Sequence, residues 1–116
     1  MVAGSGFSTE DEIDRVFHAL ADGTRRDILR RTAEREQSIS ALARHYAMSL
    51  PAVQKHVAVL ERAGLVVKSR RGREQLLSGD PATIRRAADL LDAFEALWVD
   101  RVDRIAELLG EEGTTP

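Results

Sequence analysis

Residues 49–79 have the sequence SLPAVQKHVAVLERAGLVVKSRRGREQLLSG, and this stretch decides the fold. Its first half predicts a helix from Ser49, the N-cap, to Ala63. Pro51 is tolerated in the first turn of a helix, and Gly64 suits the left-handed residue that follows one. The expected buried side consists of apolar residues at helical spacing: Val53, Val57 and Leu60. The opposite side is largely polar and basic: Pro51, Gln54, Lys55, Ala58 and Arg62.

The second half of the stretch predicts a β-hairpin. Residues 65–69 and 75–78 are rich in apolar, strand-forming side chains, and residues 70–73 place a glycine and three arginines between them. The basic tip of such a hairpin could reach DNA phosphates or a narrow minor groove.

A short helix is predicted immediately upstream, with Ser40 as its N-cap. Leu42, Ala43 and Tyr46 would face inward, and a short turn would lead to the next helix at Ser49. Two helices joined by so short a turn, the second with a basic outer face, are typical of a helix-turn-helix, although any helical hairpin can imitate the pattern. The basic hairpin that follows favours a winged helix-turn-helix, a mostly helical fold with a small β-hairpin.

The N-terminal flank predicts a flexible arm over residues 1–9, followed by two helices. Apolar residues recur at helical spacing from Glu10 to near Ala21: Ile13, Val16, Phe17 and Leu20. Asp22 and Gly23 interrupt this pattern, and Thr24 is expected to cap the second helix. The buried side of the second helix would contain Ile28, Leu29 and Ala33.

The last helix is predicted to begin after Asp80, its N-cap, and to run from Pro81 to Gly110, leaving residues 111–116 as a flexible tail. Residues 81–109 would span about 44 Å, whereas a compact chain of this length has a radius of gyration of only about 13 Å. Either a second subunit covers the helix, or the helix breaks near Ala88 and folds back. For a homodimer through the first and last helices, the expected interface residues are Ile13, Phe17, Leu91, Phe94, Trp98, Val102, Ile105 and Leu109.

Charge is distributed unevenly along the chain. Residues 23–79 carry twelve basic and five acidic side chains, whereas residues 1–22 and 80–116 have net charges of −4 and −5. A basic centre between acidic ends is typical of a protein that binds a polyanion, although a chance division of solvated helix faces would give the same pattern.

Composition excludes several classes of protein. At 116 residues the chain has the length of one domain, expected over residues 10–110. The absence of Cys excludes disulfides, thiolate metal sites and cysteine nucleophiles. No apolar run approaches the ~20 residues of a transmembrane helix, and the N-terminus lacks the features of a secretory signal. These features predict a cytoplasmic protein.

The candidate DNA contacts lie on the helix after Ser49 and on the hairpin. Gln54 suits an adenine edge, Lys55 suits guanine or phosphate, and a serine reaches either. His56 is placed either at DNA or at the base of the wing, and Arg25 and Arg26 either at phosphates or against the acidic first helix. The complete predicted set is Ser49, Leu50, Pro51, Gln54, Lys55, His56, Lys68, Arg70, Arg71 and Arg73.

No metal site, cofactor or catalytic activity is predicted. Carboxylates on the last helix could hold a hard cation, but arginines alternate with them, which is typical of a solvated, ion-paired face. His18, His45 and His56 fall on three different predicted helices. The sequence also lacks a Ser-His-Asp set, a Gly-rich phosphate loop and an HExxH spacing.

Four stretches together resemble the ArsR-type winged helix-turn-helix repressors: VFHALADGTRRDIL (16–29), SISALA (38–43), SLPAVQKHVAVL with AGLV (49–60 and 63–66), and WVDRVDRI (98–105). The last of these is similar to the C-terminal dimer helix of the metal-independent branch. Gly23 replaces the usual proline of the family, and both residues interrupt a helix. The Cys-containing metal motif is absent, and residues 81–109 contain no histidine for the alternative metal site on the last helix.

The resemblance and the residues together predict a homodimeric repressor of double-stranded DNA. Two recognition helices about 34–36 Å apart would enter successive major grooves of a palindromic operator, which could be that of its own gene. The alternative is a winged-helix module that binds proteins and not DNA, against which the basic wing argues. The sequence specifies no effector.

Overall fold

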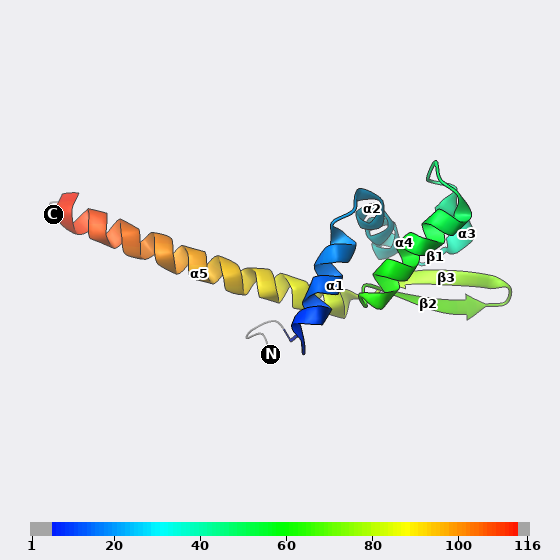
Figure 1. Ribbon diagram of the computed structural model, residues 1–116, viewed down its shortest axis with the longest axis horizontal. Helices are drawn as coiled ribbons and strands as arrows, with labels where there is room; N and C mark the ends of the chain where they lie inside the picture. The colour runs from blue at the N-terminus through cyan, green and yellow to red at the C-terminus, as the bar shows by residue number, and fades with distance from the viewer. Residues whose placement is uncertain (1–5, 114–116) are drawn as a thin grey trace.

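The computed structural model describes residues 6–113 and the side chains of residues 6–110. Its elements are α1 (Glu10–Leu20), α2 (Gly23–Glu34), β1 (Gln37–Ser38), α3 (Ile39–Ala43), α4 (Leu50–Arg62), β2 (Val66–Arg71), β3 (Glu74–Gly79) and α5 (Pro81–Gly113). Figure 1 shows α1 to α4 gathered at one end, the β2–β3 hairpin beside them, and α5 leading away to the opposite end. The predicted winged helix-turn-helix is confirmed.

The core lies where α1, α2, α3 and α4 meet the inner ends of the hairpin. Its fully buried side chains come from each of these parts: Val16, Ile28, Leu42, Val53, Val57, Leu60, Leu65 and Leu77. The apolar stripe predicted for α4 is therefore confirmed, because Val53, Val57 and Leu60 all lie on its buried side. Fully burying an aliphatic side chain stabilises a fold by about 1.5–3 kcal/mol.

The structure differs from the sequence-based expectation at Phe7. Its side chain is only 3% exposed and joins the core, and the guanidinium of Arg86 on α5 lies 5.5 Å from its ring centroid. A single aromatic residue within a small, polar segment gives no periodic signal. The flexible-arm prediction is therefore wrong at Phe7. The predicted tail of residues 111–116 is wrong over residues 111–113, because α5 continues to Gly113. Residues 1–5 and 114–116 lie outside the described part of the chain.

Side-chain caps set the helix starts. Ser49 caps α4 as predicted: its Oγ accepts from the backbone N–H of Ala52 at 3.3 Å. At α2 the cap is Asp22, two residues before the predicted Thr24, because its carboxylate accepts from the N–H of Arg25 at 3.0 Å. At α3 the cap is Ser38 and not Ser40, with the N–H of Ala41 donating to its Oγ at 3.1 Å.

The sheet contains one more strand than the sequence predicts. The antiparallel order is β1-β3-β2, with Gln37 and Ser38 paired to Leu77 and Leu76. A strand of two residues is too short to show an alternating pattern, and its pairing comes from a distant part of the chain. Gly72, at φ 64°, forms the turn between β2 and β3.

α5 is a single unbroken helix. The carboxylate of Asp80 accepts from the N–H of Ala82 at 3.0 Å, as expected for its predicted N-cap role, and no break occurs near Ala88. The alternative of two helices folding back is therefore wrong. Because most of α5 leaves the body, the molecule measures 71 × 30 × 21 Å, with a radius of gyration of 19.9 Å instead of the ~13 Å of a compact chain.

Candidate nucleic-acid interface

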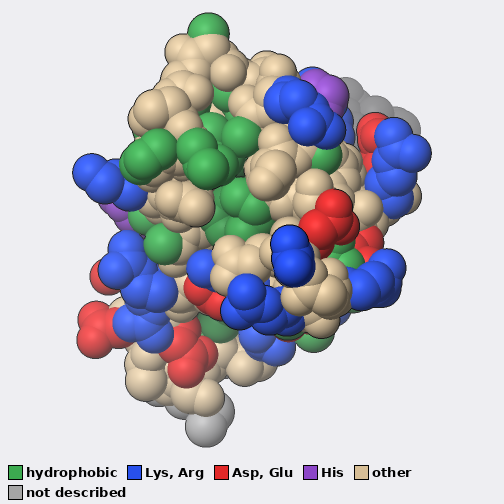
Figure 2. All heavy atoms as spheres, turned by 90° about the vertical axis from the view of Figure 1, so that its right-hand side faces the viewer, with side chains coloured by type: hydrophobic (Ala, Val, Ile, Leu, Met, Phe, Trp, Pro, Cys, Tyr) green, Lys and Arg blue, Asp and Glu red, His purple; other side chains and the backbone are tan. Residues whose placement is uncertain are grey.

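The N-terminal end of α4 is exposed at the same end of the molecule as the wing. Leu50 is 43% exposed, and the neighbouring Ser49, Pro51, Gln54 and Lys55 are exposed as well. Pro51 occupies the first turn, where a missing N–H costs no intrahelical bond. Figure 2 shows this end face-on, with Lys and Arg side chains around much of its surface.

A groove of about 310 Å³ separates this end of α4 from the wing. Leu50 and Gln54 form its α4 side, and Arg70 and Arg73 form its wing side. Its remaining walls come from β1, α3 and β3: Ser38, Ile39, Ser40, Glu74 and Gln75. The structure therefore brings together four of the predicted DNA contacts at a hollow that carries two guanidinium groups.

The wing divides its basic residues between its two faces, because successive strand residues point to opposite sides. Lys68 is directed to α4, where its Nζ lies 3.4 Å from the Glu61 carboxylate. Arg71 is directed to the other side and donates to Glu36 at 3.1 Å, although its side chain remains 76% exposed. Both predicted contacts already have an acidic partner, whereas Arg70 and Arg73 have none within residues 6–110.

His56 does not face outward with the other predicted contacts. Its side chain is 23% exposed, and its Nδ1 lies 3.2 Å from Nη1 of Arg25 and 3.9 Å from the carboxylate of Asp22. His56 therefore packs against the start of α2, neither in the groove nor at the base of the wing. The physical reason is its position on α4, one residue before the buried Val57 and three after the buried Val53.

Arg25 and Arg26 lie against the C-terminal end of α1, where they bind backbone carbonyls and not acidic side chains. Arg25 donates to the carbonyls of Ala19 and His18 at 2.8 and 3.0 Å, and Arg26 donates to the carbonyl of Leu20 at 2.7 Å. They satisfy the last carbonyls of α1, which have no intrahelical partner.

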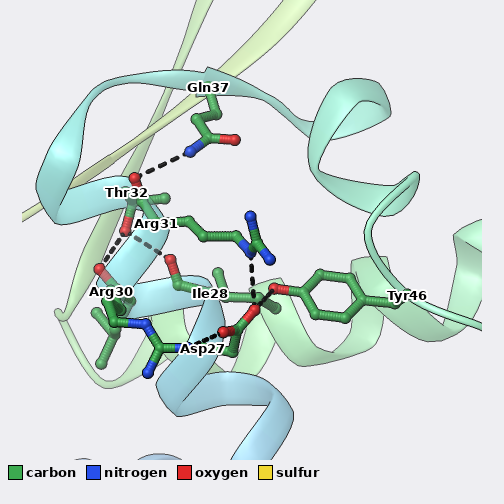
Figure 3. Close-up of polar contacts among 8 residues, drawn as sticks. Asp27, Ile28, Arg30, Arg31, Thr32, Gln37 and Tyr46 are labelled. Carbon is green, nitrogen blue, oxygen red and sulfur yellow. Dashed lines mark hydrogen bonds and ion pairs between the residues drawn. The ribbon is translucent and has the colours of Figure 1, made fainter.

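A polar cluster holds the helix-turn-helix against α2 (Figure 3). The hydroxyl of Tyr46, in the turn after α3, donates to the carboxylate of Asp27 at 2.6 Å, and Arg31 donates to the same carboxylate at 2.8 Å. These two donors lower the pKa of Asp27 to about 2. Burial, with the hydrogen bond to Asp27 as second cause, raises the pKa of Tyr46 to about 12. The cluster thus stays ionised at Asp27 and protonated at Tyr46 across the physiological range.

α5 carries a long exposed apolar face beyond the body of the protomer. The predicted interface residues on this helix are between 49% and 65% exposed: Leu91, Phe94, Trp98, Val102, Ile105 and Leu109. Phe17 joins Leu91 and Phe94 around a hollow of about 310 Å³ between α1 and α5. Ile13 lines the same hollow but is only 8% exposed, so its principal contacts are with its own core, which corrects its assignment to a dimer surface.

Comparisons with known proteins agree with this architecture. A family model described as a helix-turn-helix domain matches residues 20–69. The HTH-type transcriptional regulator Rv2034 of Mycobacterium tuberculosis is 37% identical over 106 residues, which cover 91% of this chain and 96% of the relative. An ArsR-like transcriptional regulator from Rhodococcus sp. RHA1 is 33% identical, with a TM-score of 0.77 over 88% of this chain and 96% of that one. The chain belongs to the ArsR-type winged helix-turn-helix transcriptional regulators.

A third relative bears on assembly. The solution structure of a winged helix-turn-helix domain from Mycobacterium bovis is described as homodimeric, DNA-binding and possibly of the ArsR family. It is 27% identical, with a TM-score of 0.57 over 84% of each chain. As an ArsR-type regulator, the present protein is a DNA-binding transcription regulator.

Within residues 6–110, no three His, Cys, Asp or Glu side chains are grouped so that they could hold a metal ion. None of the helices in the described chain is long and apolar enough to cross a membrane.

The sequence reasoning missed Ser38, Ser40 and Gln75 as walls of the groove. These residues could be found only by predicting β1, because the pairing of β1 with β3 brings the segment before α3 next to the wing. It also missed the acidic partners of Lys68 and Arg71. Glu61, the partner of Lys68, lies on α4, and Glu36, the partner of Arg71, lies 35 residues earlier in the chain.

Proposed function

We propose that this regulator is a homodimeric repressor that binds a palindromic operator in double-stranded DNA. The observation that carries the proposal is the exposed N-terminal end of α4 beside a groove lined by two wing arginines, Arg70 and Arg73. This arrangement fits the docking of a recognition helix, whose N-terminal residues contact base edges in the major groove. The wing then lies over the adjacent backbone or minor groove.

Individual roles follow from the chemistry of each side chain. Gln54 is assigned to an adenine edge and Lys55 to guanine or phosphate, while Leu50 suits the methyl group of thymine. Arg70 and Arg73 are assigned to phosphates, which they would hold without reading sequence. Ser49 and Pro51 border this contact. Lys68 and Arg71 contribute less, because DNA would have to compete with Glu61 and Glu36 for them.

The apolar face of α5 supports a second copy of the chain as the partner. Its residues recur every eleven positions: Leu91 with Val102, Phe94 with Ile105, and Trp98 with Leu109. Eleven residues complete three turns at 3.67 residues per turn, so the stripe stays nearly straight along the helix, with a slight right-handed drift. A straight stripe of this length suits another long helix, and the homodimeric relative from Mycobacterium bovis has the same fold.

Repression would be steric. A twofold-symmetric dimer presents two α4 helices to the two half-sites of a palindrome, about 34–36 Å apart, and so blocks access to the promoter. An input that changes the distance between the two helices would release the DNA, provided that it binds the two arrangements with different affinity. We assign the protein no cofactor or catalytic role, and we place its action in the cytoplasm.

Selection of binding sites from a pool of random-sequence DNA duplexes tests the proposal. The expected result is an enriched inverted repeat whose half-sites are about one helical turn apart. Analytical ultracentrifugation at micromolar concentration should give twice the protomer mass of 12.8 kDa. No enrichment from the pool would overturn the assignment and favour a protein-binding module, and a stable monomer would overturn the dimer.

A further inference from the structure

A second basic surface lies beside α3, next to the groove between α4 and the wing. It is an open hollow of about 520 Å³. Arg35, which follows α2, forms one wall, and Arg44 and His45, which follow α3, form another. The ring of His45 is oriented by an edge-on contact with Tyr46, 6.5 Å between centroids. None of these three residues was selected from the sequence as a DNA contact.

The cations of this hollow are available to an anion. Within residues 6–110, neither Arg35 nor Arg44 has a carboxylate within ion-pairing distance, whereas Arg30 and Arg31 on the preceding turns both pair with Asp27. One carboxylate, Glu36, lines the hollow, but it already accepts from Arg71 of the wing at 3.1 Å. The wing therefore neutralises the group that would otherwise repel an anion here.

The hollow is continuous with the proposed DNA surface. Ser38 lines both this hollow and the groove that contains Gln54, Arg70 and Arg73. In a helix-turn-helix, the helix before the recognition helix crosses the DNA backbone. A duplex with α4 in its major groove would thus bring a phosphate strand over the start of α3 and toward Arg35 and Arg44.

We propose that Arg35 and Arg44 hold a backbone phosphate of the same duplex, in the hollow beside α3. This inference rests on the proposed function and extends its footprint. A guanidinium has only donors and matches two phosphate oxygens at once, and a phosphate contact adds affinity on every sequence while releasing counterions. The contact would fix how α4 enters the groove without contributing to sequence recognition.

The test is Arg44→Ala, measured by fluorescence anisotropy on the selected operator duplex and on a scrambled duplex across a salt series. The expected result is several-fold weaker binding to both duplexes and a slope of log K against log salt that is about one unit shallower. Arg44→Lys should keep the slope, because it keeps the charge. Arg104→Ala is the matched control: it removes the same charge from the part of α5 that extends away from this end (Figure 1).

Each outcome has one meaning. If the wild-type protein binds the operator and Arg44→Ala has wild-type affinity and slope, this inference is overturned and the proposed function stands. Loss of affinity for the operator alone would also overturn it, because it would make Arg44 a base contact. If the wild-type protein binds neither duplex, the proposed function fails first. Circular dichroism confirms folding, and Arg35→Ala, with the same expected result, carries the test if Arg44→Ala does not fold.

Discussion

Residues 6–90 and residues 91–110 differ in how much of their apolar side chains is exposed. In the first region Leu42, Leu60 and Leu77 are completely buried within one protomer. In the second, every large apolar side chain from Leu91 to Leu109 is about half exposed or more. Helix formation is equally regular in both, so local propensity does not explain the difference. The first region, which we call the closed region, contains a complete core, whereas the large apolar side chains of the second, the extended region, remain exposed in the protomer.

Charge also differs between the N-terminal part of the chain and the last helix. The basic residues concentrate between residues 23 and 79, and residues 80–116 have a net charge of −5. A duplex is therefore attracted to the closed region and repelled by the extended helix, which orients an approaching DNA before any contact forms. The basic surface and the exposed apolar face are thus separated both in chemistry and along the chain.

Trp98→Ala should have the largest effect and tests the extended region. We expect dimerisation to weaken by about 3–5 kcal/mol, the usual range for removing an aromatic side chain from a packed interface. The ring also lies 5.9 Å below the guanidinium of Arg101, a contact that the substitution removes. Sedimentation equilibrium of the variant across a concentration series measures the change. Glu107→Ala, nine residues after Trp98 and so half a turn away from it around the helix, should leave the dissociation constant unchanged.

Leu60→Ala tests the closed region in the same way. The side chain is fully buried on α4, so the cavity left behind should lower the free energy of unfolding by about 2–5 kcal/mol. Guanidinium titration at one fixed protein concentration measures it, because dimerisation would otherwise shift the midpoint. Val102→Ala should change the monomer's unfolding far less. Equal losses in the two variants, measured where both are monomeric, would contradict the division between the regions.

Gln54→Ala addresses the surface of the closed region. We expect operator affinity to fall by about 1–3 kcal/mol with little change on scrambled DNA, because a base contact discriminates between sequences. Fluorescence anisotropy on both duplexes measures the two affinities.

Arg73→Ala provides the contrast on the wing side of the same groove. It should weaken both duplexes by similar factors and flatten the salt dependence by about one unit. If the two variants behaved alike, the assignment of base recognition to α4 and phosphate contact to the wing would be wrong.

Sequence reasoning succeeded where the determinants are local. The buried stripe of α4, the cap at Ser49 and the left-handed Gly64 depend on residues within one turn, and all were predictable. The continuity of α5 was left open, because periodicity shows which face of a helix is apolar and not whether the chain folds back. No glycine or proline interrupts residues 82–109, which is the local reason that the helix continues.

The errors arose where tertiary contacts choose between local options. Asp22 and Thr24 are both capable N-caps, and the choice of Asp22 is made together with Arg25, which returns to the carbonyls of α1. His56 lies on the predicted DNA face by spacing, yet Asp22 and Arg25 lie within its reach and hold it away from that face. Ion pairs such as Arg71 with Glu36 join residues 35 positions apart, a distance over which no sequence pattern extends.

Tyr46→Phe should have the smallest effect. It tests the hydrogen bond between Tyr46 and Asp27, which joins the turn after α3 to α2 in the closed region. The substitution removes the hydroxyl that donates to Asp27 while keeping the ring. Because the pair is partly exposed, we expect only the net loss of an ordinary hydrogen bond: the free energy of unfolding should fall by about 0.5–1.5 kcal/mol at neutral pH. Chemical denaturation at neutral pH measures this loss.

The pH dependence of that loss identifies its cause. Asp27 has a pKa of about 2 in the folded protein against an ordinary value of 3.8, so its contribution is present above pH 3.8 and disappears as the pH falls toward 2. The pKa of Asp27 should be higher in the variant, so the difference in unfolding free energy between wild type and Tyr46→Phe should shrink across that interval. The Tyr46 hydroxyl does not ionise there, because its own pKa is about 12. If the difference in unfolding free energy stayed constant from neutral pH to pH 2, the loss would come from packing of the ring and not from the hydrogen bond between Tyr46 and Asp27.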